Sequence, residues 1–379
     1  MKIAIIGSGI AGLYLANKLK KKNYDFDIYE KNNIIGGKIK MVDFDGIDVT
    51  AGAGILTLNK DKRMIDLCKE FNVDIEPYTN NISYTFAPFD IIKIVDKLKE
   101  NLNIITRENE RYKYTFSKFA KLILGEKDYN KFLLSVGFTD FEKADVIDTL
   151  YNYGFDEYVS GTENVYVKWG QLLENIYNKL RNHIYLSTPI KKINITDDKK
   201  FVIKNIIYDK VVFATNIDTI KYFLKNNIYK DIKVQTFVRL YVKLNKNIPN
   251  CESFIVTTKP FQKIIVINKE KCIYMISYSD NKIADKWKQV DVKKTVKRGL
   301  KTIFNEDIKV LKQKIIFWKI GTHYYKPLSR QFNSREDFIE IAQNPHENMY
   351  VIGDAVSMRQ GNCEGAVESV ENIFDKIIN

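Results

Sequence analysis

The chain has 379 residues, of which 45% are hydrophobic and 28% charged, and a formal net charge of +13. This composition is typical of a folded globular protein with room for two domains, and it excludes the disordered and fibrous classes. No apolar run reaches the roughly 18–20 residues that cross a bilayer. Residues 2–6 already predict a strand, which is unlike a signal peptide. Four scattered cysteines predict reduced thiols in a cytoplasmic protein, and three distant histidines argue against a metal site.

The positive charge has more than one explanation. Lysine is abundant together with Asn, Ile and Tyr, which share A/T-rich codons, so a solvated lysine surface is the simplest interpretation. A basic surface can also attract an acidic partner or an anionic substrate. The sequence has no helix-turn-helix, zinc-finger or RNP-type signature, so nucleic acid is not an expected partner. It leaves the oligomeric state open.

The N-terminal segment has the pattern of a dinucleotide site. A strand over residues 2–6 precedes a glycine-rich turn and a helical rhythm, and a second strand over 26–29 precedes an acid. In such a site the first glycine permits the tight turn, the second lets the backbone approach a pyrophosphate at the helix N-terminus, and the third lets helix and strand pack closely. The acid accepts hydrogen bonds from a ribose. The predicted binding residues are Gly7, Ser8, Gly9, Ile10, Ala11, Gly12, Glu30 and Lys31.

Further small residues follow this segment. A glycine pair with a lysine, a short hairpin over 44–49 around Asp45-Gly46, and a second small-residue run come next. A nicotinamide domain would continue directly into further βα units, whereas a second small-residue surface suits a longer, extended ligand. FAD is therefore the predicted cofactor, and a glycine-rich turn without a ligand is the alternative. The added binding residues are Gly36, Gly37, Lys38, Gly52, Ala53 and Gly54.

The middle of the chain divides into segments of different character. Residues 80–160 predict aromatic-rich helices whose rings form a core, and residues 232–330 predict strands with one intervening helix over 286–304. Alternation over 237–244 predicts a sheet with one covered face. A helix from Trp169 to about Asn182, a strand, turn and strand over 184–195, and a buried strand over 211–214 lie between these segments.

The C-terminal segment completes the pattern. A buried strand over 349–352 is followed by Gly353-Asp354, and the run QGNCEGAVES over 360–369 leads into the last helix. Together these motifs resemble the FAD-dependent amine oxidase superfamily, which includes monoamine and polyamine oxidases, protoporphyrinogen oxidase and phytoene desaturase-like enzymes. The resemblance covers about the first 60 residues, roughly 165–220, and about the last 35. The family's glycine pair is followed by arginine, and here by Lys38.

The resemblance implies an α/β fold. An FAD-binding Rossmann-like (GR2-type) domain would comprise residues 1–80, 165–225 and 331–379. A second, α+β substrate-binding domain, with an antiparallel sheet plus helices, would comprise 81–164 and 226–330. The two chain ends would meet around one cofactor.

The resemblance also implies roles for individual residues. Ile190 would contact adenine through its backbone, and Asp354, after Gly353, would accept a hydrogen bond from the ribityl chain. The backbone of Gly365 and Ala366 would face the pyrimidine end of the flavin. FAD would be bound non-covalently. A histidyl link is the alternative, because His323 stands where some members attach flavin to a cysteine.

Three residues are predicted to be catalytic. Arg239 matches the position of a lysine near flavin N5, where a permanent charge suits an anionic substrate or reduced flavin; an arginine on an exposed strand face is the alternative. Tyr324 matches one ring of the aromatic pair that frames an amine, and Asn362 stands where the second ring normally lies.

The leading functional prediction is an FAD-dependent oxidoreductase acting on a small molecule. It would oxidise an amine C–N bond by hydride transfer to flavin N5, and dioxygen would reoxidise the flavin to yield hydrogen peroxide. Two alternatives stay open. One is dehydrogenation of a C–C bond in a porphyrinogen- or carotenoid-like substrate, and the other is a flavin-binding scaffold without catalysis.

Overall fold

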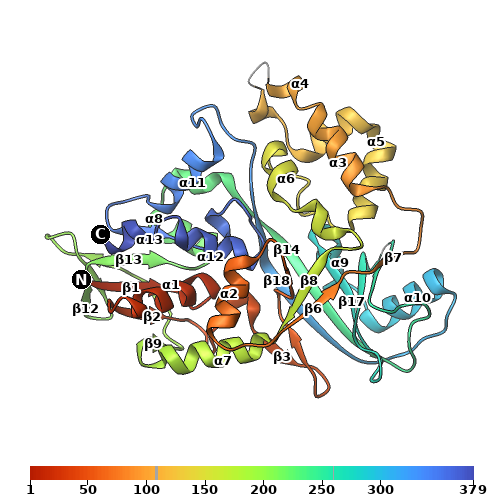
Figure 1. The fold of residues 1–379 in the computed structure, drawn as a ribbon, viewed down its shortest axis with the longest axis horizontal. Helices are drawn as coiled ribbons and strands as arrows, with labels where there is room; N and C mark the ends of the chain where they lie inside the picture. Colours follow the sequence, from red (N-terminus) through yellow and green to blue (C-terminus); the bar gives the residue numbers. More distant parts are fainter. Residues whose placement is uncertain (107–109, 259) are drawn as a thin grey trace.

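A computed structural model describes residues 1–106, 110–258 and 260–379. Two large sheets organise the molecule (Figure 1). The first is five-stranded, in the order β19-β13-β1-β2-β9, and all its neighbouring strands are parallel. Its strands are β1 (Lys2–Ile6), β2 (Asp25–Tyr29), β9 (Ile184–Tyr185), β13 (Lys210–Phe213) and β19 (Met349–Val351).

Helices cover both faces of the five-stranded sheet, which explains why β1, β2 and β13 are buried along most of their length. In β1, Ile3 and Ile5 pack into one core cluster, and Ala4 and Ile6 pack into the other. The helices of the first cluster are α1 (Ile10–Lys21), α2 (Lys62–Glu70), α7 (Trp169–Leu180), α12 (Cys363–Glu371) and α13 (Phe374–Ile378). Those of the second are α8 (Ile217–Leu224) and α11 (Arg335–Gln343).

The strand order places a binding edge at the centre of this sheet. From β1 the chain continues to β2 and β9 on one side, whereas β13 and β19 lie on the other. Ligands of parallel α/β sheets bind at the carboxyl ends of the strands where the order reverses. Here the Gly7–Gly12 turn follows β1, Ala214 follows β13 and Gly353 follows shortly after β19.

The second sheet is six-stranded, in the order β18-β14-β17-β16-β15-β7, and is antiparallel except for the parallel pair β15–β7. Its strands are β7 (Ile82–Tyr84), β14 (Ile232–Leu244), β15 (Phe254–Val256), β16 (Lys263–Asn268), β17 (Ile273–Asp280) and β18 (Val310–Tyr325). α9 (Asn281–Trp287) and α10 (Val292–Phe304) pack on one face. On the other side stand α3 (Ile91–Glu100), α4 (Asn103–Thr106), α5 (Phe116–Val136) and α6 (Val146–Asn152), as Figure 1 shows.

Smaller strand units complete the fold. β3 (Met41–Asp43) and β4 (Asp48–Thr50) form a hairpin. One three-stranded sheet has the order β5 (Ile55–Thr57), β8 (Glu163–Val167) and β6 (Ile75–Thr79). Another has the order β10 (Asn194–Ile195), β11 (Phe201–Ile203) and β12 (Ile206–Tyr208). Short 3₁₀ turns are Gly37–Ile39, Arg111–Lys113, Phe155–Tyr158, Arg181–His183, Asn227–Asp231 and Asp354–Val356.

The structure confirms the predicted α/β class, the Rossmann-like sheet and the strand-rich segment with its helical partner. Residues 107–109 of the predicted helical segment and residue 259 of the strand-rich segment lie outside the described residues. Within the part of the chain that the structure describes, no helix is both long and apolar enough to span a membrane.

Two local predictions were wrong, those for the helix over 286–304 and for the strand over 237–244. The single helix over 286–304 is two helices, because the Asp291 side chain accepts the Lys294 N–H at 3.1 Å and starts α10 anew. The strand, turn and strand predicted over 184–195 are present, with β9 and β10 in different sheets. Ile190 lies between them, half-buried against a core cluster, and its adenine contact stays a prediction. Strand β14 is covered on both faces, since the neighbours Phe237 to Val242 are all buried.

Candidate functional site

Three small-residue segments lie side by side at the carboxyl edge of the five-stranded sheet. The Gly36 N–H donates to the Ser8 carbonyl at 2.9 Å, and Gly9 and Gly36 form a parallel bridge. The Ala53 N–H donates to the Lys38 carbonyl at 3.0 Å. The predicted second small-residue surface therefore lies against the first.

The three glycines of the first turn differ in the space beside their Cα atoms. Gly7 has φ of 110°, and a Cβ there would collide with the Ala214 carbonyl. A Cβ on Gly12 would collide with the Gly7 carbonyl. Gly9 is different, because a Cβ there would meet nothing within 4 Å. Gly9 is also the N-cap of α1, and since glycine has no side chain, the first N–H groups of the helix, from Ile10 on, have no capping acceptor there. These N–H groups are suited to bind a phosphate.

Glu30 lies beside this turn at the end of β2 and is buried. One carboxylate oxygen accepts the Ser8 N–H at 3.0 Å and the Ser8 hydroxyl at 2.8 Å. The other accepts the Asn32 N–H at 2.9 Å and the Asn32 side-chain amide at 2.7 Å. The hydroxyl and the amide are mobile donors that a ribose diol could replace. Lys31, the next predicted binding residue, is exposed.

Lys38, Asp354 and His323 form a cluster that joins the two ends of the chain. Lys38 Nζ lies 3.0 Å from Asp354 Oδ2 and donates to the Gly321 carbonyl at 3.0 Å. His323 Nδ1 lies 3.0 Å from the same Asp354 oxygen. Burial would raise the pKa of Asp354, but Lys38 and His323 together bring this pKa well below its usual value. The predicted meeting of the N- and C-terminal segments is thus present.

The start of α12 completes this end of the site. The Asn362 side chain accepts the Gly365 N–H at 2.7 Å, which makes Asn362 the helix cap. A Cβ on Gly365 would collide with the Arg359 carbonyl, and Ala366 is buried in the core. Glu364 accepts the Met64 N–H at 2.9 Å and so ties α12 to the start of α2.

Arg239 lies on the other large sheet and is buried, with 4% exposure. The alternative of an exposed arginine is therefore wrong. Its Nη1 donates to Thr50 Oγ1, and its guanidinium carbon lies 4.8 Å from the Tyr278 ring centroid. A Cβ on Gly54 would lie 3.1 Å from Nη2, so this glycine leaves room beside the guanidinium. No carboxylate among the described residues lies within ion-pair distance of Arg239.

The structure does not bring all three predicted catalytic residues together. Asn362 and Tyr324 lie near one another, because Gly361, next to Asn362, approaches Thr322. Thr322 lies two residues before Tyr324. Tyr324 pairs with Lys233 on β14, however, and Arg239 lies six residues further along the strand, about 20 Å away at the usual strand rise. Tyr324 is half-buried, and burial raises its pKa.

Several site residues were missed in the sequence. Two tryptophans hold the Ala51–Gly54 segment: the Trp318 indole donates to the Ala51 carbonyl at 2.7 Å, and the Trp169 indole to the Gly54 carbonyl at 3.4 Å. Three buried polar atoms on β14 and β18 have no hydrogen-bond partner among the described residues: Arg239 Nε, Thr322 Oγ1 and His323 Nε2. A buried polar atom without a partner requires an explanation, and a bound ligand is one. No sequence signal marks Thr50, Tyr278 or Thr322, because their meeting depends on sheet pairing.

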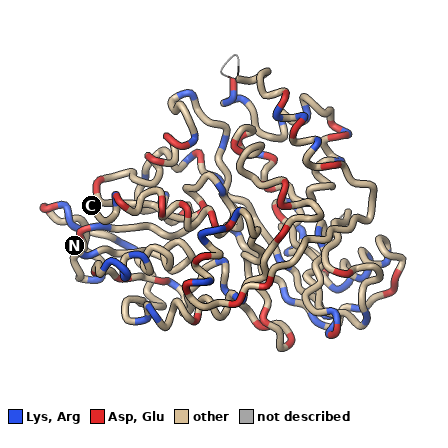
Figure 2. The backbone as a smooth tube through the Cα atoms, in the orientation of Figure 1, with Lys and Arg blue, Asp and Glu red and all other residues tan. Residues whose placement is uncertain are grey.

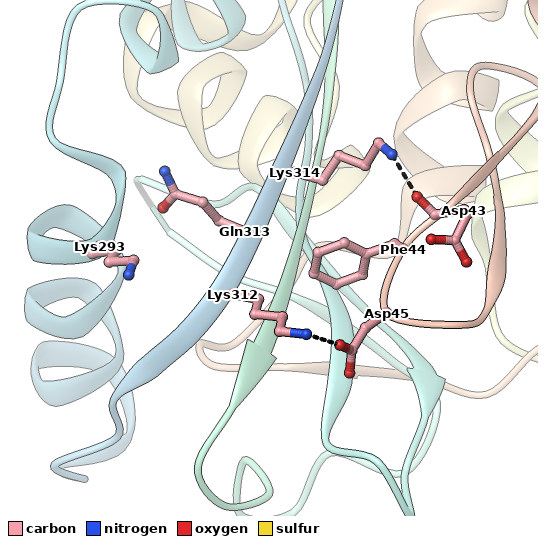
Figure 3. Close-up of a pocket in the computed structure, with 7 residues that line it drawn as sticks. All are labelled: Asp43, Phe44, Asp45, Lys293, Lys312, Gln313 and Lys314. Atoms are coloured by element: carbon pink, nitrogen blue, oxygen red, sulfur yellow. Dashed lines mark hydrogen bonds and ion pairs between the residues drawn. The ribbon is translucent and has the colours of Figure 1, made fainter.

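A groove of about 530 Å³ lies elsewhere, between the tip of the β3–β4 hairpin, β18 and α10 (Figure 3). Part of its charge is paired internally, since Asp45 binds both Lys312 and Lys243, and Lys314 donates to the Asp43 carbonyl. It contains none of the predicted ligand residues, and we assign it no role. Its lining residues are Asp43, Phe44, Asp45, Lys293, Lys312, Gln313 and Lys314.

Comparison with known proteins places this geometry in context. The family model for an NAD(P)-binding Rossmann-like domain matches residues 5–71. A 1-hydroxycarotenoid 3,4-desaturase from Flavobacterium sp. (strain P99-3) is 31% identical over 136 residues, which is 31% of this chain and 27% of the relative. A 4,4'-diaponeurosporene oxygenase from Staphylococcus haemolyticus (strain JCSC1435) is 30% identical over 142 residues, 34% of this chain and 27% of the relative. The matched part thus spans about a quarter of each of these relatives.

Solved structures of putrescine oxidase share the whole fold. A double mutant aligns with a TM-score of 0.80 and 11% identity, covering 100% of this chain and 98% of that one. The wild-type enzyme bound to putrescine aligns with a TM-score of 0.78 and 11% identity, covering 100% and 99%. At this identity the likeness shows the fold alone.

The site and these comparisons define a Rossmann-fold protein with an attached α+β half. They confirm the predicted resemblance: the chain matches a Rossmann-like family model near its N-terminus, is similar in part to enzymes of carotenoid modification, and has the fold of putrescine oxidase.

Proposed function

We propose that the chain binds FAD non-covalently and uses it to oxidise a small molecule. The observation that carries this proposal is the meeting of Gly9, Gly36 and the Lys38–Asp354 pair at the carboxyl edge of the parallel sheet. Residues 1–80, 165–225 and 331–379 would hold the cofactor, and the substrate would lie against residues 81–164 and 226–330. The Rossmann family match and the full-length likeness to putrescine oxidase support this arrangement.

The residues present fit the parts of FAD in order. The N-terminus of α1 with its open Gly9 suits the pyrophosphate, and Glu30 suits the adjacent ribose. Asp354 suits the ribityl hydroxyls as a charged acceptor, because its pKa is held low beside Lys38. The unpartnered His323 Nε2 and Thr322 Oγ1 could hydrogen-bond the ring system.

FAD, when bound, would supply the two-electron acceptor: a substrate C–H gives up hydride, the adjacent nitrogen loses a proton as a C=N bond forms, and dioxygen finally takes two electrons and two protons as hydrogen peroxide. The chain itself would orient the substrate, exclude water and stabilise charge. No acid–base triad is required for this chemistry.

Oxidation of a C–N bond is the leading reaction, supported by the putrescine oxidase fold. Dehydrogenation of a C–C bond is the second candidate, supported by the sequence similarity to an enzyme of carotenoid desaturation. An anaerobic panel separates the two. Bleaching of the bound flavin by amines favours the first, bleaching by polyene or porphyrinogen substrates favours the second, and no bleaching favours a scaffold.

Substitution of Gly9 tests the cofactor site itself. Gly9→Ala places a methyl group in open space at a φ of −69°, which alanine tolerates, so the apoprotein should keep its thermal stability. The methyl group would block the approach of the pyrophosphate, and we expect FAD affinity to fall at least about 100-fold in fluorescence titrations. Unchanged affinity, or a purified wild-type protein that neither contains nor accepts FAD, would contradict the proposal.

A further inference from the structure

Arg239 is a buried permanent cation whose partners do not neutralise it. Its Nη1 is used by Thr50 Oγ1 and by the Tyr241 hydroxyl at 3.5 Å, and both partners are neutral. The Nε and Nη2 atoms, which form the other edge of the guanidinium, donate no hydrogen bond to any residue that the structure describes. An arginine stays charged in proteins, and an unpaired buried charge is strongly unfavourable. The free edge therefore calls for an anion.

The geometry of that edge favours a carboxylate. Two parallel N–H groups of an arginine match the two oxygens of a carboxylate. Gly54 keeps the space beside Nη2 open, since a Cβ there would lie only 3.1 Å from that atom. The rings of Tyr278 and Phe237 lie 4.8 Å and 5.8 Å from the guanidinium carbon and offer apolar surface to the rest of a ligand.

The buried acids of the same region are committed elsewhere. Asp280 accepts the Thr139 N–H at 2.8 Å and the Asp140 N–H at 3.1 Å. Asp140 accepts the Tyr153 hydroxyl at 2.6 Å. Burial raises the pKa of both carboxyl groups, that of Asp280 to about 7, so neither is a ready counter-ion. Lys263 is another buried amine of this sheet, and burial lowers its pKa. It cannot serve as a counter-ion for Arg239, because a lysine is either positively charged or neutral.

Arg239 lies on the six-stranded sheet, whereas the cofactor's pyrimidine end is expected at Gly365 and Ala366, beside the Lys38–Asp354–His323 cluster. Its guanidinium faces Thr50 and Gly54, at the edge of the second small-residue segment. Arg239 lies on the sheet face that the helical segment covers, because Tyr278 contacts Phe138 at 4.9 Å between ring centroids. We propose that Arg239 binds the carboxylate of the substrate, so that this oxidoreductase acts on carboxylate-bearing amines such as amino acids rather than on bare diamines. This inference rests on the proposed function.

Matched carboxylate and amide probes test the inference on the FAD-loaded protein. Benzoate and benzamide have the same shape and differ in charge, as do acetate and acetamide. Each is titrated while the flavin absorbance and the unfolding temperature are followed. We expect at least one carboxylate to bind ten-fold or more tightly than its amide. R239Q should erase that preference, R239K should retain part of it, and K319Q, which alters an exposed lysine, should leave it intact.

Each result has a defined meaning. Equal binding of acid and amide in every pair, or a preference that survives in R239Q, would overturn the inference. If R239Q fails to fold, R239K tests the inference in its place, because lysine keeps the charge but lacks the paired N–H groups of the guanidinium. A carboxylate preference unchanged in R239K would argue against bidentate binding. A wild-type protein without FAD contradicts the proposed function instead, and the thermal shifts of that protein with benzoate and benzamide still test Arg239.

Discussion

The two large sheets each contribute to the candidate site, but they do so by different means. At the carboxyl edge of the five-stranded sheet, backbone groups and missing side chains create the site, as at Gly9 and Gly36. On the inner face of the six-stranded sheet, buried side chains such as Arg239 and Tyr278 create it. The first kind of site depends on space left free beside the backbone, whereas the second depends on which polar groups are present.

The largest effect is expected where the backbone is crowded. Gly12→Ala would force its methyl group against the Gly7 carbonyl and separate α1 from β1, lowering the free energy of unfolding by about 3 kcal/mol or more. Denaturant titration measures this loss. Gly170→Ala is the matched control, because its Cβ would meet only the Met41 side chain at 3.7 Å. Equal stability of both variants would contradict the close packing of α1 against the Gly7 turn.

The charged cluster that joins the chain ends should rank second. Asp354→Asn leaves Lys38 and His323 without their carboxylate, and we expect a loss of about 2–4 kcal/mol at pH 7. The surface change Asp66→Asn, in an exposed pair with Lys69, should cost close to nothing. Similar losses in both would show that the cluster contributes no more than a surface pair.

The same carboxylate predicts a pH dependence. Because the folded protein holds the pKa of Asp354 below its value in the unfolded chain, folding releases a proton in acid. The stabilisation is complete above about pH 4 and declines as the pH falls further. The difference in unfolding temperature between wild type and Asp354→Asn should therefore shrink from pH 7 to pH 3. A constant difference would exclude this assignment.

The cap of α12 distinguishes two roles of Asn362. Asn362→Ala should lose about 1 kcal/mol of stability, because the Gly365 N–H loses its acceptor. Asn362→Asp keeps the acceptor and should restore stability. If the rate of flavin reduction is also restored, Asn362 acts through the helix. A slow but stable Asn362→Asp would support the predicted catalytic role.

The smallest effect concerns the support of Arg239. Thr50→Val removes the hydroxyl that accepts from Nη1 while keeping the shape, and we expect benzoate to bind about five-fold more weakly, close to 1 kcal/mol. Thr50→Ser should recover the affinity. No change in either variant would mean that Thr50 does not orient the guanidinium.

The site at the five-stranded sheet could largely be predicted from the sequence. The Gly7–Gly12 turn, its flanking strands and Glu30 are close in sequence, so their pattern predicts their geometry. The patterns at the two chain ends predict that these ends meet, but they do not reveal that Lys38 pairs with Asp354 or that His323 shares the carboxylate.

The inner face of the six-stranded sheet was much harder to predict. Arg239 was selected by its position in a strand, but its partners come from β4 and β17, which only sheet pairing brings near. Likewise, alternation along β14 suggested one covered face, because a sequence cannot show that a separate helical segment packs on the other. Short strands such as β9 and β10 likewise carry too little pattern to show which sheet each joins, and the adenine contact of Ile190 between them stays a prediction.

The long strand β18 has a mechanical consequence. One continuous stretch carries Trp318, which holds Ala51, then Gly321, which accepts from Lys38, then His323, which contacts Asp354. It is paired with β14 over most of its length. The paired strands β14 and β18 therefore link the two large sheets. A hinge movement that separates the sheets would break the contacts that β18 makes with Lys38, Ala51 and Asp354. We expect turnover to rely on loops and side chains at the rim, with the framework held still.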